Sequence, residues 1–325
     1  MTTDAESAAP PRPEFLALGG LYKQEIEPWL LSQEGRRRRA RLLRWLIIGG
    51  GFALLALWLY EHLAGGGSDV WLFVMFILAI AVVVFGNVPL AMLESDVKAF
   101  VMEKLAGFFH FTYEAAPDFV DFGLFTDLFL LPYHHNKKFE DGLQGEIKGV
   151  PFRMVEAHLT ERRKSGKNSR NVTVFRGLLL SLPHAATGDA LVSVWRRDGG
   201  QGMQDAGWQD VALGDLDFDR DYIVHTNDAA AARNLLDRET RRAFAALDRR
   251  EDVEEVRLGL ADGRLLLAAD LRTDSFESGK MNRPLADPNR VQAMVELFAF
   301  PFDAVDGFRL QPSASTVPAE LQGQS

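Results

Sequence analysis

A small set of polar residues in the second half of the chain could do acid–base chemistry. Glu140, Asp141, Glu156 and His158 combine carboxylates with an imidazole, the groups that most often transfer protons in enzymes. They are scattered over two segments, and no spacing between them is typical of a catalytic motif. The sequence therefore keeps an enzyme of unknown reaction as an alternative, and it favours a binding protein.

Other motifs that carry chemistry are missing. With no cysteine, the chain has no disulfides, cysteine-based zinc sites or thiol catalysis. Its two Gly triplets are not followed by the Lys-Ser/Thr of a phosphate-binding loop, and no Gly-x-Ser-x-Gly segment occurs. The neighbouring His134 and His135 would point in different directions on any regular element, so we expect a surface loop there. We predict neither a cofactor nor a metal ion.

Four aspartates alternate with other residues ahead of a predicted strand: Asp215, Asp217, Asp219 and Asp221. Calcium loops need a glycine at the sixth position and a closing glutamate, and this segment has neither. We interpret the pattern as a solubilising one.

Two basic clusters stand out in an acidic chain. The 325 residues include 36 Lys and Arg against 45 Asp and Glu, and the net charge of -9 argues against nucleic acid as a partner. The first cluster precedes an apolar stretch and consists of Arg36, Arg37, Arg38, Arg39 and Arg41. The second lies in a predicted hairpin loop and consists of Arg162, Arg163, Lys164, Lys167 and Arg170. For the first cluster we favour a role in membrane orientation, and for the second a solvated hairpin tip. The alternative for both is contact with anionic lipid headgroups or, for the second, an acidic partner.

Two apolar stretches predict a transmembrane hairpin with spans at 42–63 and 70–93. A helix needs ~20 mainly apolar residues to cross the hydrocarbon core of a bilayer, and residues 70–93 carry no charge at all. A cleaved signal peptide does not fit the first stretch, because it begins too far from Met1. The hairpin is therefore predicted to be an anchor in the lipid bilayer.

The charges around the hairpin predict its orientation. The arginine cluster precedes the first span, the connector 61–69 has no Lys or Arg, and Lys98 and Lys104 follow the second span. By the positive-inside rule, we predict that both termini are cytoplasmic. Residues 1–41 then form an N-terminal cytosolic segment with an amphipathic stretch and the basic cluster.

Amphipathic stretches flank the hairpin at 15–31, with a break expected at Pro28, and at 97–108. Packing on a neighbouring helix is favoured over lying on the membrane surface, because the basic bias of a surface helix is weak. Within the hairpin, small residues line one face of the first span, which allows close approach of the second: Gly49, Ala53 and Ala56.

Residues 95–310 predict one cytosolic α+β domain with an antiparallel sheet. Branched and aliphatic residues alternate with turn signals, which is typical of strands. The strands are expected at 143–156, 171–182, 190–196, 208–213, 222–225, 253–260 and 265–271. Helices are expected at 229–247 and 288–300, and the Ser/Pro/Gln-rich tail 311–325 is expected to be disordered.

The domain resembles the bacterial DUF3137 family of membrane proteins of unknown function. Matching segments run in order from Glu140-Asp141-x-x-x-Gly145 through Phe152-x-x-x-Glu156-Ala157 and Val174-Phe175-Arg-Gly-Leu178. They continue through Asp219-x-x-Tyr222-x-Val224-x-Thr226-x-Asp228 and Ala232-Arg-x-Leu235-Leu236 to Ser275-Phe276-Glu277. The resemblance covers roughly residues 95–310. It implies a bacterial inner-membrane protein and supplies no catalytic residues.

Taken together, these features predict a membrane-anchored binding or scaffold protein at the inner leaflet. Its expected partner is another protein or an anionic lipid, and the ligand and oligomeric state stay open. Phe175, Arg176 and Gly177 mark the first candidate functional surface, since a glycine within a strand often serves a bulge. The alternative for Phe175 is packing in the core.

Overall fold

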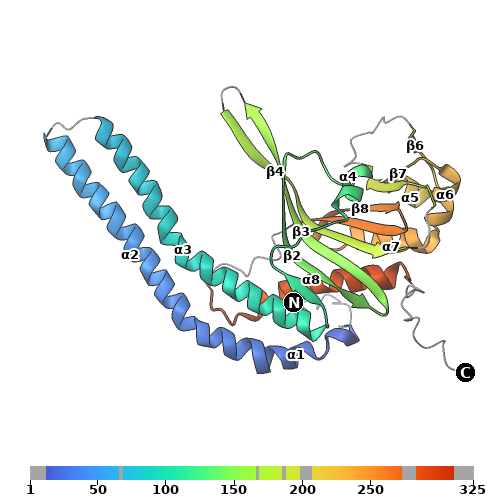
Figure 1. Ribbon diagram of the computed structural model, residues 1–325, viewed down its shortest axis with the longest axis horizontal. Coiled ribbons are helices and arrows are strands. Elements are labelled where there is room, and N and C mark those ends of the chain that lie inside the picture. Colours follow the sequence, from blue (N-terminus) through green and yellow to red (C-terminus); the bar gives the residue numbers. More distant parts are fainter. Residues whose placement is uncertain are drawn as a thin grey trace, which may run out of the picture. The chain divides into compact units, whose positions relative to one another are not determined.

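The computed structural model describes residues 12–65, 69–165, 168–184, 188–197, 207–272 and 283–310 (Figure 1). The chain divides into two compact units. The first comprises the residues up to 104 together with 277–292, and the second comprises residues 105–276 and those from 293 onward. The predicted boundary at residue 95 lies inside a helix that continues to Phe108. The predicted tail 311–325 lies outside the described residues.

Two long helices, α2 (Glu27–Gly65) and α3 (Asp69–Phe108), form most of the first unit. Three short elements precede α2: η1 (Pro13–Phe15), α1 (Leu18–Leu21) and η2 (Tyr22–Ile26). The break expected at Pro28 is wrong, because the helical chain continues through it. η2 is a π-helix, so the missing N–H of Pro28 falls where the regular ladder of hydrogen bonds is already altered.

Both helices are long and apolar enough to cross a membrane. The predicted spans 42–63 and 70–93 lie within α2 and α3. Large apolar side chains along these spans are exposed, among them those of Trp45, Leu54, Phe73 and Phe85. A water-soluble surface rarely exposes a continuous apolar band of this kind, whereas a lipid bilayer accommodates it.

Two glycines allow α2 and α3 to approach each other closely. A Cβ atom on Gly51 would lie 2.4 Å from Val82 Cγ1, and one on Gly86 would lie 2.8 Å from Ile48 Cγ1. We expected Gly49 at this contact, but a Cβ atom on Gly49 would have nothing within 4 Å. The contact through small residues therefore exists, but it is made by Gly51 rather than Gly49.

The amphipathic stretches on either side of the apolar region pack against each other. The rings of Trp29 and Phe100 stack with their centroids 3.8 Å apart, and Lys104 Nζ lies 2.6 Å from Glu25 Oε2. Apolar side chains of both stretches are buried: Ile26, Leu30, Val97 and Val101. The expectation that they pack on a neighbouring helix is confirmed.

The second unit is built on one antiparallel sheet, which confirms the predicted α+β class. In the described residues nine strands pair in the order β1-β2-β3-β4-β9-β8-β5-β7-β6. They are β1 (Thr112–Glu114), β2 (Asn136–Ile147), β3 (Val150–Ser165), β4 (Asn168–Pro183), β5 (Val192–Arg196), β6 (Gln209–Asp210), β7 (Tyr222–Thr226), β8 (Val253–Ala261) and β9 (Arg264–Leu271). The helices of this unit are α4 (Phe122–Asp127), α5 (Leu216–Asp221), α6 (Ala229–Leu235), α7 (Arg238–Asp248) and α8 (Pro288–Gly307).

Both faces of the central strands are covered. On one face, α4 and residues 128–131 pack on Leu159, Phe175 and Leu179. On the other face, the ring of Phe152 in β3 meets a cluster of aromatic rings that includes Phe111 and, from α8, Phe298. Because both faces are buried, residues 178–182 and 265–269 form almost unbroken apolar runs rather than an alternating pattern.

Two local predictions are wrong. The strand expected at 143–156 is two strands, because Lys148 and Gly149 turn the chain with φ of 52° and 82°. The helix expected at 229–247 is split into α6 and α7, since Asp237 begins a new helix by accepting a hydrogen bond from Thr240 N at 2.8 Å.

The four aspartates ahead of β7 lie in and around the short helix α5. Asp217 is 88% exposed, as a solubilising residue would be, whereas Asp215 and Asp219 also bond the local backbone. Asp215 accepts from Phe218 N at 3.3 Å as the N-cap of α5. Asp219 accepts from the backbone N–H groups of Leu213 and Gly214, each at 2.9 Å, and so fixes the loop that leads into the helix.

Candidate functional site: an arginine-lined cleft

The polar residues that sequence analysis singled out for acid–base chemistry lie on neighbouring strands, but each is bonded elsewhere. Glu140 and Glu156 face each other in the register of β2 and β3, and Glu156 is buried. The His158 ring lies 2.9 Å from Thr173 Oγ1, and Asp141 accepts from the Tyr113 hydroxyl at 2.7 Å. Burial and the nearby Arg176 guanidinium lower the pKa of His158.

The predicted functional surface at residues 175–177 is mainly part of the fold. Phe175 is buried in the core, and Arg176 Nε lies 3.5 Å from Glu156 Oε1. A Cβ atom on Gly177 would lie 1.8 Å from the backbone oxygen of Ala269, so no larger residue fits beside β9. The irregularity of β4 lies at Val174, where the register with β3 shifts, rather than at Gly177.

The first arginine cluster does not form one surface. Arg37 is buried, and its Nε donates to both oxygens of Glu34 at 2.9 and 3.0 Å. Arg36 donates to Asp96 at 3.0 Å, and Arg38 lies 3.7 Å from Glu34 with an exposed side chain. Arg39 is exposed and Arg41 is half-buried. The helical periodicity distributes these neighbouring arginines around α2.

The second basic cluster lies on a two-stranded arm (Figure 1). Residues 161–165 pair with 168–172 and with no other strand of the described chain, because β2 pairs with β3 only as far as Thr160. Arg162 donates to Ser169 Oγ, Arg163 pairs with Glu161 at 2.7 Å, and Lys164 and Arg170 are exposed. Lys167 lies outside the described residues. We call residues 161–172 the basic arm.

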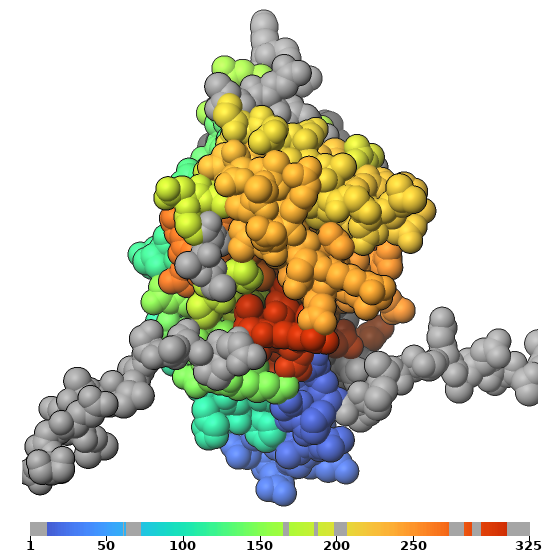
Figure 2. Space-filling view, turned by 90° about the vertical axis from the view of Figure 1, so that its right-hand side faces the viewer, coloured from blue at the N-terminus to red at the C-terminus, as the bar shows by residue number. Residues whose placement is uncertain are grey.

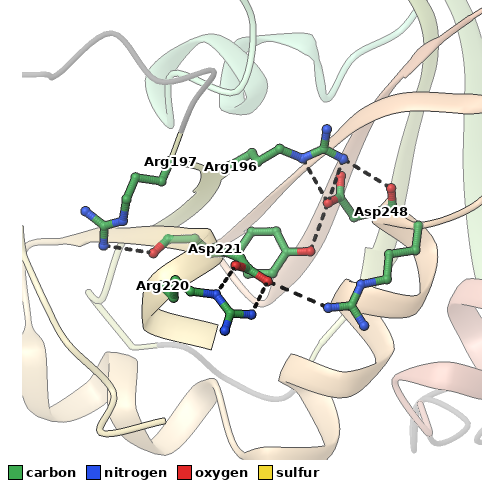
Figure 3. A pocket seen from close by; sticks show the side chains of 7 residues that line it. Arg196, Arg197, Arg220, Asp221 and Asp248 are labelled. Atoms are coloured by element: carbon green, nitrogen blue, oxygen red, sulfur yellow. Dashed lines mark hydrogen bonds and ion pairs between the residues drawn. The ribbon is translucent and has the colours of Figure 1, made fainter. Parts of the chain in front are cut away.

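A cleft of about 500 Å³ lies where several elements end (Figure 3). It is lined by Arg196, Arg197, Arg220, Asp221, Tyr222, Asp248 and Arg249. Arg196 ends β5 and Arg197 follows it, α5 and the start of β7 contribute the next three, and Asp248 ends α7 with Arg249 as its C-cap. The segments from β7 to α7 form a continuous outer surface of the molecule, coloured yellow to orange in Figure 2. We call this feature the arginine cleft.

Asp248 holds one side of the arginine cleft together. Its carboxylate accepts from Arg196 at 2.9 Å, from the Tyr222 hydroxyl at 2.9 Å and from the backbone N–H of Val256 at 2.8 Å. Arg196 and Tyr222 are register partners in β5 and β7, which brings their side chains to the same buried carboxylate. Burial, reinforced by the charge of Asp248, raises the pKa of the Tyr222 phenol. On this side of the cleft, the charges of Asp248 and Arg196 compensate each other, and the hydrogen bonds of Asp248 make the floor of the cleft rigid.

Two of the remaining arginines pair with Asp221, and Arg220 also lies 3.3 Å from the exposed Asp217. Arg220 Nε lies 2.8 Å from Asp221 Oδ1, and an Arg249 terminal nitrogen lies 3.8 Å from Asp221 Oδ2. Arg197 instead donates to two backbone oxygens, that of Asp219 at 2.7 Å and that of Tyr222 at 3.3 Å. Within the described residues, no carboxylate forms an ion pair with Arg197. The cleft therefore combines four guanidinium groups with two carboxylates.

Sequence analysis missed this cleft because its residues come from three separate segments, each of which contributes only one or two arginines. The signal that could have found it is the repetition of arginine pairs where elements end, at 196–197 and 249–250, in an otherwise acidic domain. Among the described residues, no group of three or more His, Asp or Glu side chains is arranged to hold a metal ion.

Comparison with known proteins finds a family model that matches part of this chain. Residues 173–310 match the family model described as "Protein of unknown function (DUF3137)", and this range includes the whole arginine cleft. This match confirms the resemblance to the DUF3137 family noted from the sequence. No curated protein matches the chain.

One solved structure is similar in part. The crystal structure of the mycobacterial trehalose monomycolate transport factor A, TtfA, aligns with 62% of this chain and 95% of its own chain. The sequence identity is 15% and the TM-score is 0.34, which is too low to bear on the fold or the function of this chain.

Proposed function

We propose that this chain is an integral protein of the bacterial inner (plasma) membrane that uses its sheet domain as a binding or scaffold module at the inner leaflet. The observation that carries the proposal is the pair of long helices with exposed apolar side chains along the segments 42–63 and 70–93. The arginines at 36–41 and the connector 61–69 without Lys or Arg support an orientation with both termini in the cytoplasm.

Two surfaces of the sheet domain are suited to binding rather than to catalysis. The basic arm carries exposed cations on a ribbon that no other described strand covers, and such cations are attracted to anionic headgroups by about 1 kcal/mol each near a membrane surface. The arginine cleft is a concave polar surface with a rigid floor. The partner in this proposal is a protein or an anionic lipid, and no cofactor is involved.

The lipid branch of the proposal is tested with the full chain in vesicles. A fluorophore on Ser169→Cys reports the distance between the basic arm and a headgroup-labelled lipid by energy transfer. We expect more transfer in anionic than in neutral vesicles, and we expect salt to abolish the difference. A variant with glutamine at Arg162, Arg163, Lys164 and Arg170 should show no such difference.

The protein branch is tested by cross-linking in the native membrane, followed by purification of the full chain in mild detergent. Recovery of one protein in a fixed ratio to the chain supports the scaffold role. If no protein co-purifies in a fixed ratio and the basic arm shows equal energy transfer in anionic and neutral vesicles, the proposed binding function is wrong.

A further inference from the structure

The charges of the arginine cleft do not cancel. Four arginines and two aspartates line it, and the carboxylate of Asp248 is buried in contacts with Arg196, Tyr222 and Val256. Among the lining residues, the single charge of Asp221 is shared by Arg220 and Arg249. Arg220 also pairs at 3.3 Å with Asp217, an exposed carboxylate that does not line the cleft. The lining thus carries an excess of two positive charges at neutral pH, since arginine stays protonated there.

Part of this excess positive charge is located at Arg197. Its guanidinium is oriented by the backbone oxygens of Asp219 and Tyr222, which accept hydrogen bonds but contribute no formal charge. Five N–H donors are fixed on each guanidinium, and two backbone acceptors leave most of those on Arg197 for another partner. An anion bound in the cleft would compensate the positive charge that the carboxylates lining the cleft leave uncompensated.

The neighbouring surface extends the same chemistry. A groove of about 260 Å³ shares Asp221, Tyr222 and Arg249 with the arginine cleft. Arg238, Arg241 and Arg242 of α7 line its other side. Arg241 lies 3.4 Å from Asp215. With Asp217 and Asp221 included, three carboxylates and four arginines line the groove, so its excess is one positive charge.

We propose that the arginine cleft binds a phosphate group through Arg197, Arg220 and Arg249. Guanidinium groups form paired, charge-assisted hydrogen bonds with phosphate oxygens, and three of them from separate elements can surround a tetrahedral anion. The phosphate belongs either to a soluble phosphate compound or to a phospholipid headgroup. The proposal names a ligand for the sheet domain, so it rests on the proposed binding function and not on the membrane orientation.

The first arm of the test uses the full chain in nanodiscs of neutral lipid, titrated with inorganic phosphate at constant ionic strength. The test variant is Arg220→Gln combined with Arg249→Gln, whose side chains are 67% and 69% exposed and therefore contribute little to the core. The matched control is Arg309→Gln, which is 68% exposed and pairs with Glu239 outside the cleft. We expect phosphate to bind the wild type and the control equally, and at least ~tenfold more weakly to the test variant.

The second arm replaces the neutral lipid with phosphatidylglycerol and measures the unfolding temperature. If headgroups occupy the cleft, phosphatidylglycerol raises this temperature for the wild type and the control but not for the test variant. The proposal is overturned if the wild type responds to neither probe, or if the test variant binds as the wild type does. The cross-linking and energy-transfer results are independent of both arms, so the proposed binding function can stand when this proposal fails.

Discussion

In the arginines at 36–41 and in those of the arginine cleft, the spacing in the sequence and the proximity of the side chains in the structure are related in opposite ways. The first set is nearly contiguous in the chain, yet its side chains lie on different sides of α2. Arg37 is buried beside Glu34, whereas Arg38 is exposed. The second set is separated by up to 53 residues, from Arg196 to Arg249, yet it lines one cleft. A basic run within a helix therefore does not by itself predict a binding surface, because a helix distributes neighbouring residues around its axis.

The two sets of arginines also differ in how their positive charges are compensated. Arg37 pairs with Glu34 and Arg196 with Asp248, and both arginines are largely buried. Arg220 and Arg249 share Asp221, Arg220 also pairs with the exposed Asp217, and Arg197 donates to backbone oxygens. Arginines with a largely buried ion pair stabilise the fold, while the exposed guanidinium groups of the cleft are accessible to an anion.

The largest expected effect is at the floor of the arginine cleft. Asp248→Ala removes a buried carboxylate and leaves Arg196 and the N–H of Val256 without their acceptor, which should lower the free energy of unfolding by about 3–5 kcal/mol. Asp217→Ala removes a carboxylate that is 88% exposed and should change it by less than about 0.5 kcal/mol. Urea unfolding of the detergent-solubilised chain measures both. Equal effects would show that Asp248 does not organise the cleft.

The next effect compares two neighbours in the first cluster. Arg37→Gln removes the charge that compensates Glu34 and should destabilise the chain by about 1–3 kcal/mol, because its side chain is only 7% exposed. Arg38→Gln should change stability by less than about 0.5 kcal/mol, since its side chain is 78% exposed. The unfolding temperatures of the two variants, each compared with that of the wild type, measure this difference in stability. A larger loss for Arg38→Gln would contradict the distribution of these arginines around α2.

The smallest effect concerns Asp270, whose side chain is half-buried, unlike that of Asp248. Burial raises the pKa of Asp270 to about 6, against the opposing effects of the Arg176 N–H and of Arg257. A pKa that is higher in the folded state means that stability is lost as pH rises through about 6. Because the carboxyl keeps partial contact with solvent, we expect a loss of about 1–2 kcal/mol between pH 4 and 7.

Asp270→Asn should remove this loss, because the amide does not ionise and still offers an oxygen to the Arg176 N–H. Unfolding free energies of the wild type and of Asp270→Asn, measured from pH 4 to 7, should therefore diverge as pH rises, with the variant the more stable at pH 7. Parallel curves would show that this carboxyl is fully compensated.

Much of the fold could be predicted from local chemistry. The apolar run at 178–182 and the turn at Asp262-Gly263, with φ of 49° and 66°, follow from branched side chains and from residues that tolerate positive φ. The turn at Lys148-Gly149 was missed because lysine is rarely found at positive φ. The break between α6 and α7 was missed because an aspartate that caps a helix resembles any exposed aspartate in a polar stretch.

The arginine cleft could not be predicted in the same way. Strand pairing brings Arg196 beside Tyr222, and the end of α7 adds Asp248 and Arg249. These contacts depend on the strand order β8-β5-β7, in which β5 pairs with strands that are distant in the sequence. Periodicity reports which residues share a face of one element, and it contains no information on which elements meet.

The most direct test of the account is the topology of the full chain in living cells. The chain has no cysteine, so a single introduced cysteine gives one label site. With a maleimide that does not cross membranes, we predict that Gly67→Cys in the connector is labelled in intact bacterial cells after removal of the outer barrier. Ser169→Cys in the basic arm should be labelled only after the inner membrane is opened. Labelling of Ser169→Cys in cells with an intact inner membrane would contradict the cytosolic placement of the sheet domain.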